Sequence, residues 1–178
     1  ECELFDYNNI SNDSEYQKNI YDSLMEVIFS CLKKYIKLYK DSEAFPDFIN
    51  DWNIEDIGSP SSIWKKVVVQ ILKYERNKDT DFAIEYHTDH GGDTVSAIRG
   101  DKSLISVLIY LNDDYEGGEI SFLNEFDKSI ITYKPSAGDV IVFPTDFWHA
   151  SLPYSGTNKY FVRYFLTCYF PRSQEWLE

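Results

Sequence analysis

The chain has 178 residues, of which 43% are hydrophobic and 17% aromatic, a composition typical of a folded globular domain rather than a disordered chain. Its 30 acidic and 17 basic residues give a formal net charge of −13, which would repel a phosphate backbone, so we expect no nucleic-acid partner. No apolar run approaches the roughly 18 residues that a membrane span requires, so we expect no membrane partner either.

Residues 14–40 carry apolar side chains at three- and four-residue spacing, which predicts an amphipathic helix. The apolar stripe comprises Ile20, Leu24, Val27, Ile28, Cys31, Tyr35 and Leu38. Polar capping residues precede it and lysines cluster toward its end, where cations favour the helix dipole. We expect the stripe to pack against the outside of a sheet, and we expect the Pro- and Gly-containing residues 41–62 to form a loop-rich connection.

From Trp64 onward the apolar period changes to two, which is typical of β-strands. The predicted strands are Trp64–Tyr74, Phe82–Asp89, Leu104–Leu111, Glu119–Leu123, Ser129–Tyr133, Asp139–Phe143, Phe147–Ser151 and Lys159–Phe170. Many short strands joined by polar turns predict an antiparallel sandwich or jelly roll. The fold class is therefore mainly β with an N-terminal α segment: a single domain over 1–178, with helical and loop support over about 1–63 and a β core over about 64–171.

Glycines mark the connections between these strands. The pair Gly117-Gly118 and the segment 137–139 predict turns in which a positive φ is needed. The loop His90–Ser103 contains three glycines and several charged residues, so it offers little to bury. We expect this loop to be more mobile than the barrel and to act as a lid.

Two of the three histidines belong to a pattern that suits a metal. His87 and Asp89 stand two residues apart, so a β-strand would direct both to one face. His149, far downstream, can complete a site of two histidines and one carboxylate, the donor set of non-haem Fe(II) oxygenases. Alone, such a pair is equally compatible with a strand-end histidine beside a solvated aspartate.

The residues around this pattern are more specific. In order they are the segments Leu108–Asn112, Glu116–Phe122, Pro135–Pro144, Trp148–His149 and Lys159–Tyr164. With His87 and Asp89 ahead of them, they resemble the 2-oxoglutarate- and Fe(II)-dependent dioxygenases, prolyl-4-hydroxylase-like branch, over about residues 66–170. The resemblance implies a double-stranded β-helix, a cupin-like jelly-roll barrel packed against one or more helices. It also implies that His87, Asp89 and His149 are the catalytic metal ligands for Fe(II).

The activity implied by the resemblance is hydroxylation by Fe(II), with O2 and 2-oxoglutarate as cosubstrates and with succinate and CO2 released; ascorbate is a candidate auxiliary reductant. A peptidyl proline is the favoured substrate. A free amino acid or another small molecule is the alternative, since close relatives use these too. A different class of function is a non-catalytic metal-binding barrel for sensing or interaction, although an intact ligand set and basic residue favour an enzyme. The oligomeric state stays open.

Two basic residues compete for the role of cosubstrate anchor. On the last strand Lys159 and Arg163 share one face, and a buried cation there needs an anionic partner. The distal carboxylate of 2-oxoglutarate is such a partner, and the family's basic residue, about ten positions after the distal histidine, matches Lys159. Arg163 is the alternative, because its guanidinium can bind a carboxylate bidentately. If Glu85 faces inward with His87, an ion pair between Arg163 and Glu85 is another role for this arginine.

Three further aromatic residues and one histidine complete the candidates. Tyr110 matches a position where related hydroxylases bond the distal carboxylate, and Tyr74 matches a tyrosine that lines the cosubstrate pocket. Ordinary core packing explains either tyrosine equally simply. His90 lies three residues after His87, off the shared strand face, so we assign it to the loop. We expect Trp148 to pack or to form pocket wall.

The three cysteines, Cys2, Cys31 and Cys168, are odd in number and lack metal-ligand spacing. We therefore expect reduced, mostly buried thiols, with Cys168 in the core of an apolar strand. Reduced thiols predict a soluble protein of a reducing, cytoplasmic compartment.

Overall fold

The computed structural model describes residues 2–5, 15–39, 69–74, 82–89 and 101–169. One helix, α1 (Glu15–Tyr39), is followed along the chain by most of the strands. The strands are β1 (Cys2–Phe5), β2 (Val69–Tyr74), β3 (Phe82–His87), β4 (Asp101–Tyr110), β5 (Tyr115–Gly117), β6 (Ile120–Leu123), β7 (Ile130–Tyr133), β8 (Val140–Pro144), β9 (Trp148–Gly156) and β10 (Lys159–Tyr169).

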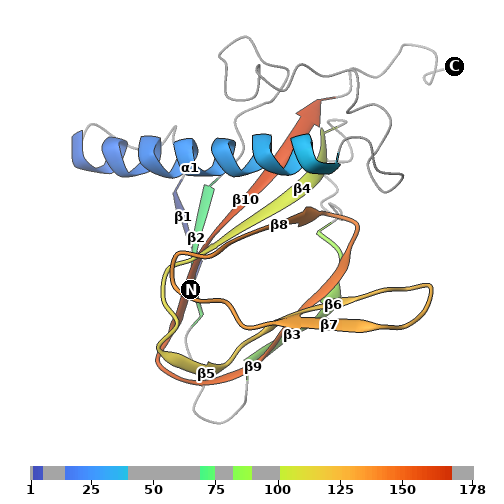
Figure 1. The fold of residues 1–178 in the computed structure, drawn as a ribbon. Coiled ribbons are helices and arrows are strands. Elements are labelled where there is room, and N and C mark those ends of the chain that lie inside the picture. The colour runs from blue at the N-terminus through green and yellow to red at the C-terminus, as the bar shows by residue number, and fades with distance from the viewer. Residues whose placement is uncertain (1, 6–14, 40–68, 75–81, 90–100, 170–178) are drawn as a thin grey trace, which may run out of the picture.

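The strands form two antiparallel sheets that face each other (Figure 1). The first sheet has the order β1-β2-β10-β4-β8, and the second has the order β3-β9-β6-β7 with β5 paired to β9. The chain crosses between the sheets from β2 to β3, β3 to β4, β4 to β5, β7 to β8, β8 to β9 and β9 to β10. This interleaving is a jelly roll, or double-stranded β-helix, and it confirms the predicted fold class.

Alternation along β4 and β10 separates two apolar layers. Val107 on β4 and Val162 on β10 belong to the layer beneath α1. Leu108 and Phe161, each one residue along, belong to the layer between the two sheets. Because successive side chains of a strand point to opposite faces, one strand serves the helix and the barrel interior at once. The interior layer is the one that adjoins the candidate site.

The helix is amphipathic and lies across the first sheet (Figure 1). Its core-facing side chains Ile28, Leu32 and Ile36 repeat every four residues and are at most 1% exposed. The predicted stripe was partly wrong, because Val27 is 44% and Leu38 76% exposed. The buried face is a single row of side chains four residues apart, which is narrower than the predicted stripe. This face packs on the sheet as predicted.

The eight predicted strands are confirmed wherever the structure describes them, with ends that shift by a few residues. β1 and β5 were not predicted. The turn predictions are confirmed, since Gly117, Gly118 and Gly138 have φ of 71°, 69° and 89°. Residues 90–100 of the predicted lid lie outside the described residues, and residues 101–103 belong to β4. The predicted loop 41–62 and the first part of the first predicted strand, residues 64–68, also lie outside the described residues. In the described part of the chain, no helical segment combines the length and apolar character needed to cross a membrane.

Candidate active site

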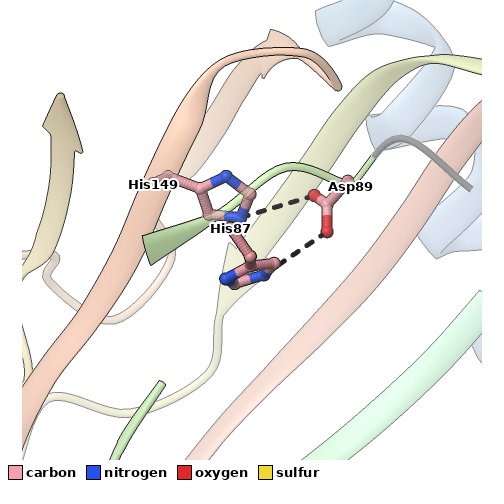
Figure 2. Close-up of side chains that lie close together, drawn as sticks. All are labelled: His87, Asp89 and His149. Atoms are coloured by element: carbon pink, nitrogen blue, oxygen red, sulfur yellow. Dashed lines mark ion pairs between the residues drawn. The ribbon is translucent and has the colours of Figure 1, made fainter. Parts of the chain in front are cut away.

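His87, Asp89 and His149 converge in the interior of the barrel (Figure 2). One ligand atom from each residue lies within 4.8 Å of the others. His87 ends β3 and is the cross-strand partner of His149 on β9, so the sheet itself places the two imidazoles side by side. Asp89 follows two residues later, and its carboxylate oxygens lie 3.7 Å from His87 Nε2 and 3.5 Å from His149 Nε2. The predicted triad therefore comes together in space.

Backbone carbonyls orient both imidazoles in the same way. Nδ1 of His87 lies 2.8 Å from the carbonyl oxygen of Glu85, and Nδ1 of His149 lies 2.9 Å from that of Phe147. A carbonyl oxygen only accepts, so each Nδ1 carries the proton and each neutral Nε2 keeps its lone pair. Both lone pairs are then available on the ring nitrogens nearest Asp89. Two such nitrogens and one carboxylate are a donor set that suits a divalent transition metal.

Asp89 is held from a third element. Ser106 on β4 is fully buried, and its Oγ donates a 2.7 Å hydrogen bond to Asp89 Oδ2. The Asp89 side chain is only 6% exposed, so this bond compensates part of the cost of burying a carboxylate. Ser106 also limits the directions in which the carboxylate can turn.

His149 is the more buried of the two histidines, with a side chain 8% exposed compared with 38% for His87. The ring of Phe143 packs against its imidazole at 4.7 Å between centroids. Burial is the main cause that lowers the pKa of His149, against opposing effects of the Phe147 carbonyl and Asp89. A lowered pKa keeps the imidazole neutral near pH 7, and the neutral form is the one that can bind a metal.

The strand-parity argument for β3 was partly wrong. Ile84 and His87 both line the pocket, whereas Glu85 is exposed and does not face inward. The cause is a register shift between Ile84 and His87. Their partners on β9 are Ser151 and His149, so β3 advances by three residues where β9 advances by two. A bulge of this kind turns His87 inward and moves Glu85 to the surface. The ion pair considered between Arg163 and Glu85 required an inward-facing Glu85, and Arg163 instead donates to Gln70.

Lys159 is the most deeply buried charged residue among the described ones, at 1% exposure. Its Nζ donates to the carbonyl of Gly118 at 2.7 Å and to Ser151 Oγ at 3.2 Å. No carboxylate in the described ranges lies within ion-pair distance of it. Burial, followed by the nearby Lys134, lowers the pKa of Lys159 to about 8, against a smaller effect of Glu119. A buried ammonium bound only by neutral acceptors is suited to an incoming anion.

The two predicted tyrosines lie in the same pocket as Lys159. Tyr110 is 3% exposed, and the Lys159 ammonium lies 5.3 Å from the centre of its ring. Tyr74 is the cross-strand partner of Lys159, and its ring packs on Phe161 at 5.2 Å. Burial raises the pKa of Tyr110 well above its usual range, so its hydroxyl stays protonated and can donate a hydrogen bond.

Arg163 also lines the pocket, but its guanidinium already has a partner. Nε and a terminal nitrogen both donate to the side-chain oxygen of Gln70 on β2, with Nε at 2.9 Å. The guanidinium also lies over the ring of Phe165, at 5.0 Å from its centroid. Arg163 is thus fixed by protein contacts, whereas Lys159 has no charged partner among the residues that the structure describes.

Three contributors were not found from the sequence. They are the hydroxyl of Ser106, the carbonyl of Gly118 and the hydroxyl of Ser151. Ser106 did have a signal, because it is one polar residue inside an apolar strand, four residues from Tyr110 and therefore on the same face. A backbone carbonyl has no signal in the residue types. His90 lies outside the described residues, and Trp148, predicted to pack, is half-buried.

Comparison with known proteins agrees with this geometry. Residues 69–171 match the family model described as the 2OG-Fe(II) oxygenase superfamily, which is more than half of the chain. Among curated proteins, prolyl 4-hydroxylase 1 of Arabidopsis thaliana is 32% identical over 85 residues. That alignment covers 43% of this chain and 29% of the plant protein, so the chain matches less than a third of that relative's length.

Two solved structures are similar in part. A 2OG-Fe(II) oxygenase-family oxidoreductase of Burkholderia pseudomallei is 19% identical, with a TM-score of 0.46 over 65% of this chain and 56% of that one. The viral collagen prolyl hydroxylase of Paramecium Bursaria Chlorella virus-1 is 22% identical, with a TM-score of 0.45 over 68% of this chain and 71% of the other. On the strength of the family match, the chain belongs to the 2OG-Fe(II) oxygenase superfamily.

Proposed function

We propose that this chain is an Fe(II)- and 2-oxoglutarate-dependent dioxygenase that hydroxylates its substrate and releases succinate and CO2. One observation carries the proposal: the His87–Asp89–His149 cluster and the buried Lys159 ammonium line the same pocket. A candidate metal site and a buried cation with no carboxylate partner in the described part of the chain suit 2-oxoglutarate, a keto acid with a distal carboxylate.

The residues present fit the metal. His87, Asp89 and His149 would hold Fe(II) through two neutral imidazole nitrogens and one carboxylate, and three protein donors leave further coordination positions open. Bound iron supplies the O2-activating redox chemistry that no side chain can provide. The chain's own contribution is orientation: carbonyls fix the imidazoles, and Ser106 fixes Asp89. The apolar rings of Phe122 and Phe143 pack near His149 and limit the access of water.

Lys159 and Tyr110 would hold the distal carboxylate of 2-oxoglutarate. The ammonium would supply a charge-assisted hydrogen bond, and the protonated Tyr110 hydroxyl a second donor. Tyr74 and Phe161 would form the apolar wall beside the methylene groups of the cosubstrate. Arg163, with its two bonds to Gln70, would serve mainly to keep β10 and β2 in place. Ascorbate would act only by restoring the reduced metal.

A peptidyl proline is the substrate that we propose. The support is the curated plant relative, which is a prolyl 4-hydroxylase by name and shares 32% identity over 85 residues. A free amino acid is the second candidate substrate, because the pocket residues that we assign bind the metal and the cosubstrate rather than the group to be hydroxylated.

The test is substrate-dependent release of succinate. The purified chain would be incubated with Fe(II), 2-oxoglutarate, ascorbate and O2, with proline-containing peptides, with free amino acids or with neither. The proposal predicts that peptides raise succinate release and gain 16 mass units at proline, and that Asp89→Ala abolishes both. Stimulation by free amino acids alone would replace the peptide by the second candidate. Metal binding with no turnover on any substrate would favour a non-catalytic binding module.

A further inference from the structure

A second concave surface adjoins the candidate metal site. It is a groove of about 580 Å³ between the β6–β7 hairpin and the turn that joins β8 to β9. Four aromatic residues line it: Phe122, Phe126, Phe147 and Trp148. We name it the hairpin groove. Figure 1 shows the β6–β7 hairpin projecting away from the body of the barrel.

The apolar side chains of this groove are unusually accessible. Phe126 is 98% exposed, Ile131 68% and Phe147 45%. Each exposed aromatic ring costs free energy in water, and a contiguous apolar surface of this kind marks a binding site more often than a neutral face. The groove therefore has the composition of a surface that is covered when a ligand is present.

The hairpin tip that presents Phe126 is well ordered by its own hydrogen bonds. The Asn124 side chain accepts from the Phe126 N–H at 2.9 Å, and the Asn124 N–H donates to the Ser129 carbonyl at 2.9 Å. Asp127 accepts from both the N–H and the hydroxyl of Ser129, which closes the turn. Because the closed turn fixes the backbone at Phe126, a ligand that binds there orders less backbone than it would in an open loop, and this favours recognition.

The groove and the metal site are neighbours on the strands β6 and β9. Phe122 is the cross-strand partner of His149, and their rings lie 6.3 Å apart between centroids. Trp148, in the groove, directly precedes His149 in sequence. The groove thus lies within one side chain of a metal-ligand candidate, with the ring of Phe122 between the groove and His149. This closeness places the groove where a segment flanking the residue to be hydroxylated could lie.

The charge of the groove selects its ligand. Glu125 and Asp146 supply its carboxylates, and the described lining residues include no lysine or arginine. The whole chain adds a net charge of −13. Two carboxylates at the rim of an apolar groove favour a ligand that combines apolar side chains with a positive charge.

The neighbouring strand favours a polypeptide over a small molecule. β7 is the last strand of its sheet, and all four of its residues are exposed. Within the described part of the chain, β7 pairs only with β6, so one of its edges is free to bond an added extended strand. Ile131 lines the groove and belongs to this strand.

We propose that the hairpin groove binds an extended segment of a polypeptide substrate that carries basic and apolar side chains next to the residue to be hydroxylated. This inference rests on the proposed function, because it assigns the substrate class of that same site. It makes Phe126, Phe147, Glu125 and Asp146 determinants of substrate specificity, distant in role from the metal and cosubstrate.

The test uses three synthetic 12-residue peptides with a central proline. One flanks the proline with leucine and lysine, the second has glutamate in place of each lysine, and the third has serine in place of each leucine. Binding of fluorescein-labelled peptides to the full chain, loaded anaerobically with Fe(II) and 2-oxoglutarate, is followed by anisotropy. We expect the first peptide to bind at least about tenfold more tightly than the other two, from combined charge and apolar contacts.

Paired variants locate the contact. Phe126→Ser should weaken binding of the first peptide by roughly tenfold, since aromatic anchors dominate such surfaces. Glu125→Gln with Asp146→Asn should weaken it by about three- to tenfold and reduce the discrimination against glutamate, most clearly at low salt. Leu38→Ser and Glu26→Gln on α1 are the controls, because both residues are exposed on an element outside the groove. They should leave binding unchanged.

The possible outcomes distinguish a failure of the groove proposal from a failure of the proposed function. Fe(II) and 2-oxoglutarate binding, measured in the same samples, reports on the active site alone. If both bind but the three peptides are not distinguished, or the groove variants behave like the α1 controls, the groove proposal is wrong and the proposed function stands. If the peptides are distinguished but Fe(II) and 2-oxoglutarate do not bind together, the groove stands and the proposed function fails.

Discussion

Ser106 Oγ and Asp89 Oδ2 are joined by a 2.7 Å hydrogen bond that links β4 to the second residue after β3. Ser106 belongs to the first sheet and Asp89 follows a strand of the second, so this bond connects the two sides of the barrel. It leaves Oδ1 of Asp89 without that restraint, 3.7 Å from Nε2 of His87. The serine thus determines how the carboxylate is presented between the two imidazoles.

Replacing Ser106 by alanine should weaken metal binding without preventing folding. Loss of a partner that orients a metal ligand typically lowers affinity by about 10- to 100-fold, and we expect the lower end of this range for a neutral hydroxyl. The measurement is a Mn(II) or Fe(II) titration of the variant by calorimetry. Ser121→Ala is the control: Ser121 is also fully buried, and its hydroxyl bonds Tyr86 instead of a ligand. Equal effects of both variants would mean that Ser106 is only a packing residue.

Lys159→Ala should raise the concentration of 2-oxoglutarate needed for half-maximal binding by roughly 30- to 150-fold, the effect of losing a buried charge-assisted hydrogen bond. Metal affinity should barely change, because the candidate metal ligands are untouched. Arg163→Ala should act on stability instead, since its guanidinium bonds Gln70. Titrating 2-oxoglutarate into each variant checks this. Loss of cosubstrate binding in the arginine variant alone would exchange the two roles.

The buried ammonium should also cost stability. The pKa of Lys159 is lowered from 10.5 to about 8 in the folded state, so between these values the unfolded chain holds more protons. Stability from this group therefore rises as pH increases from about 8 to about 10.5. The free energy of unfolding of Lys159→Met minus that of the wild type should therefore be roughly 2–3 kcal/mol larger at pH 7 than above pH 10.5. Urea unfolding of both proteins at several pH values measures the difference; no pH dependence of it would contradict the lowered pKa.

Gly118→Ala should destabilise the barrel near Lys159, whose ammonium donates to the Gly118 carbonyl. An added Cβ would lie 2.9 Å from Tyr115 and 3.0 Å from Tyr154 in a backbone with φ of 69°. We expect a loss of about 2–4 kcal/mol, from a disfavoured φ together with steric overlap. Gly138→Ala separates the two causes, because φ there is 89° with no atom within 4 Å of the added Cβ. Thermal unfolding of both variants should show the larger loss for Gly118→Ala.

Residue patterns predicted most of the fold because strand periodicity depends on local alternation, which β4 and β10 keep over many residues. Lys159, Phe161 and Arg163 do share one face, as alternation requires. The same rule was wrong on β3, where a bulge shifts the register and Glu85 becomes exposed. A bulge depends on the partner strand, so a single strand's residue types do not reveal it.

The features that were not predicted depend on contacts between residues far apart in the sequence. β1 consists of four residues that pair with β2 at the edge of a sheet, and so short a segment lacks a recognisable period. The stripe predicted for α1 was broader than the buried face because several apolar rows run along this helix, and only packing on the sheet selects Ile28 and Leu32. The Gly118 carbonyl that binds Lys159 belongs to the backbone and depends on the turn geometry.

The most direct test of the site is an anaerobic optical titration of the full chain with Fe(II) and 2-oxoglutarate together. If His87, Asp89 and His149 hold the metal and Lys159 the cosubstrate, the mixture shows the weak visible charge-transfer band of a metal-bound keto acid. The band is absent with either component alone and in His149→Ala, and it needs more 2-oxoglutarate in Lys159→Ala. Absence of the band in the wild type, or its persistence in His149→Ala, would contradict the assignment of this site.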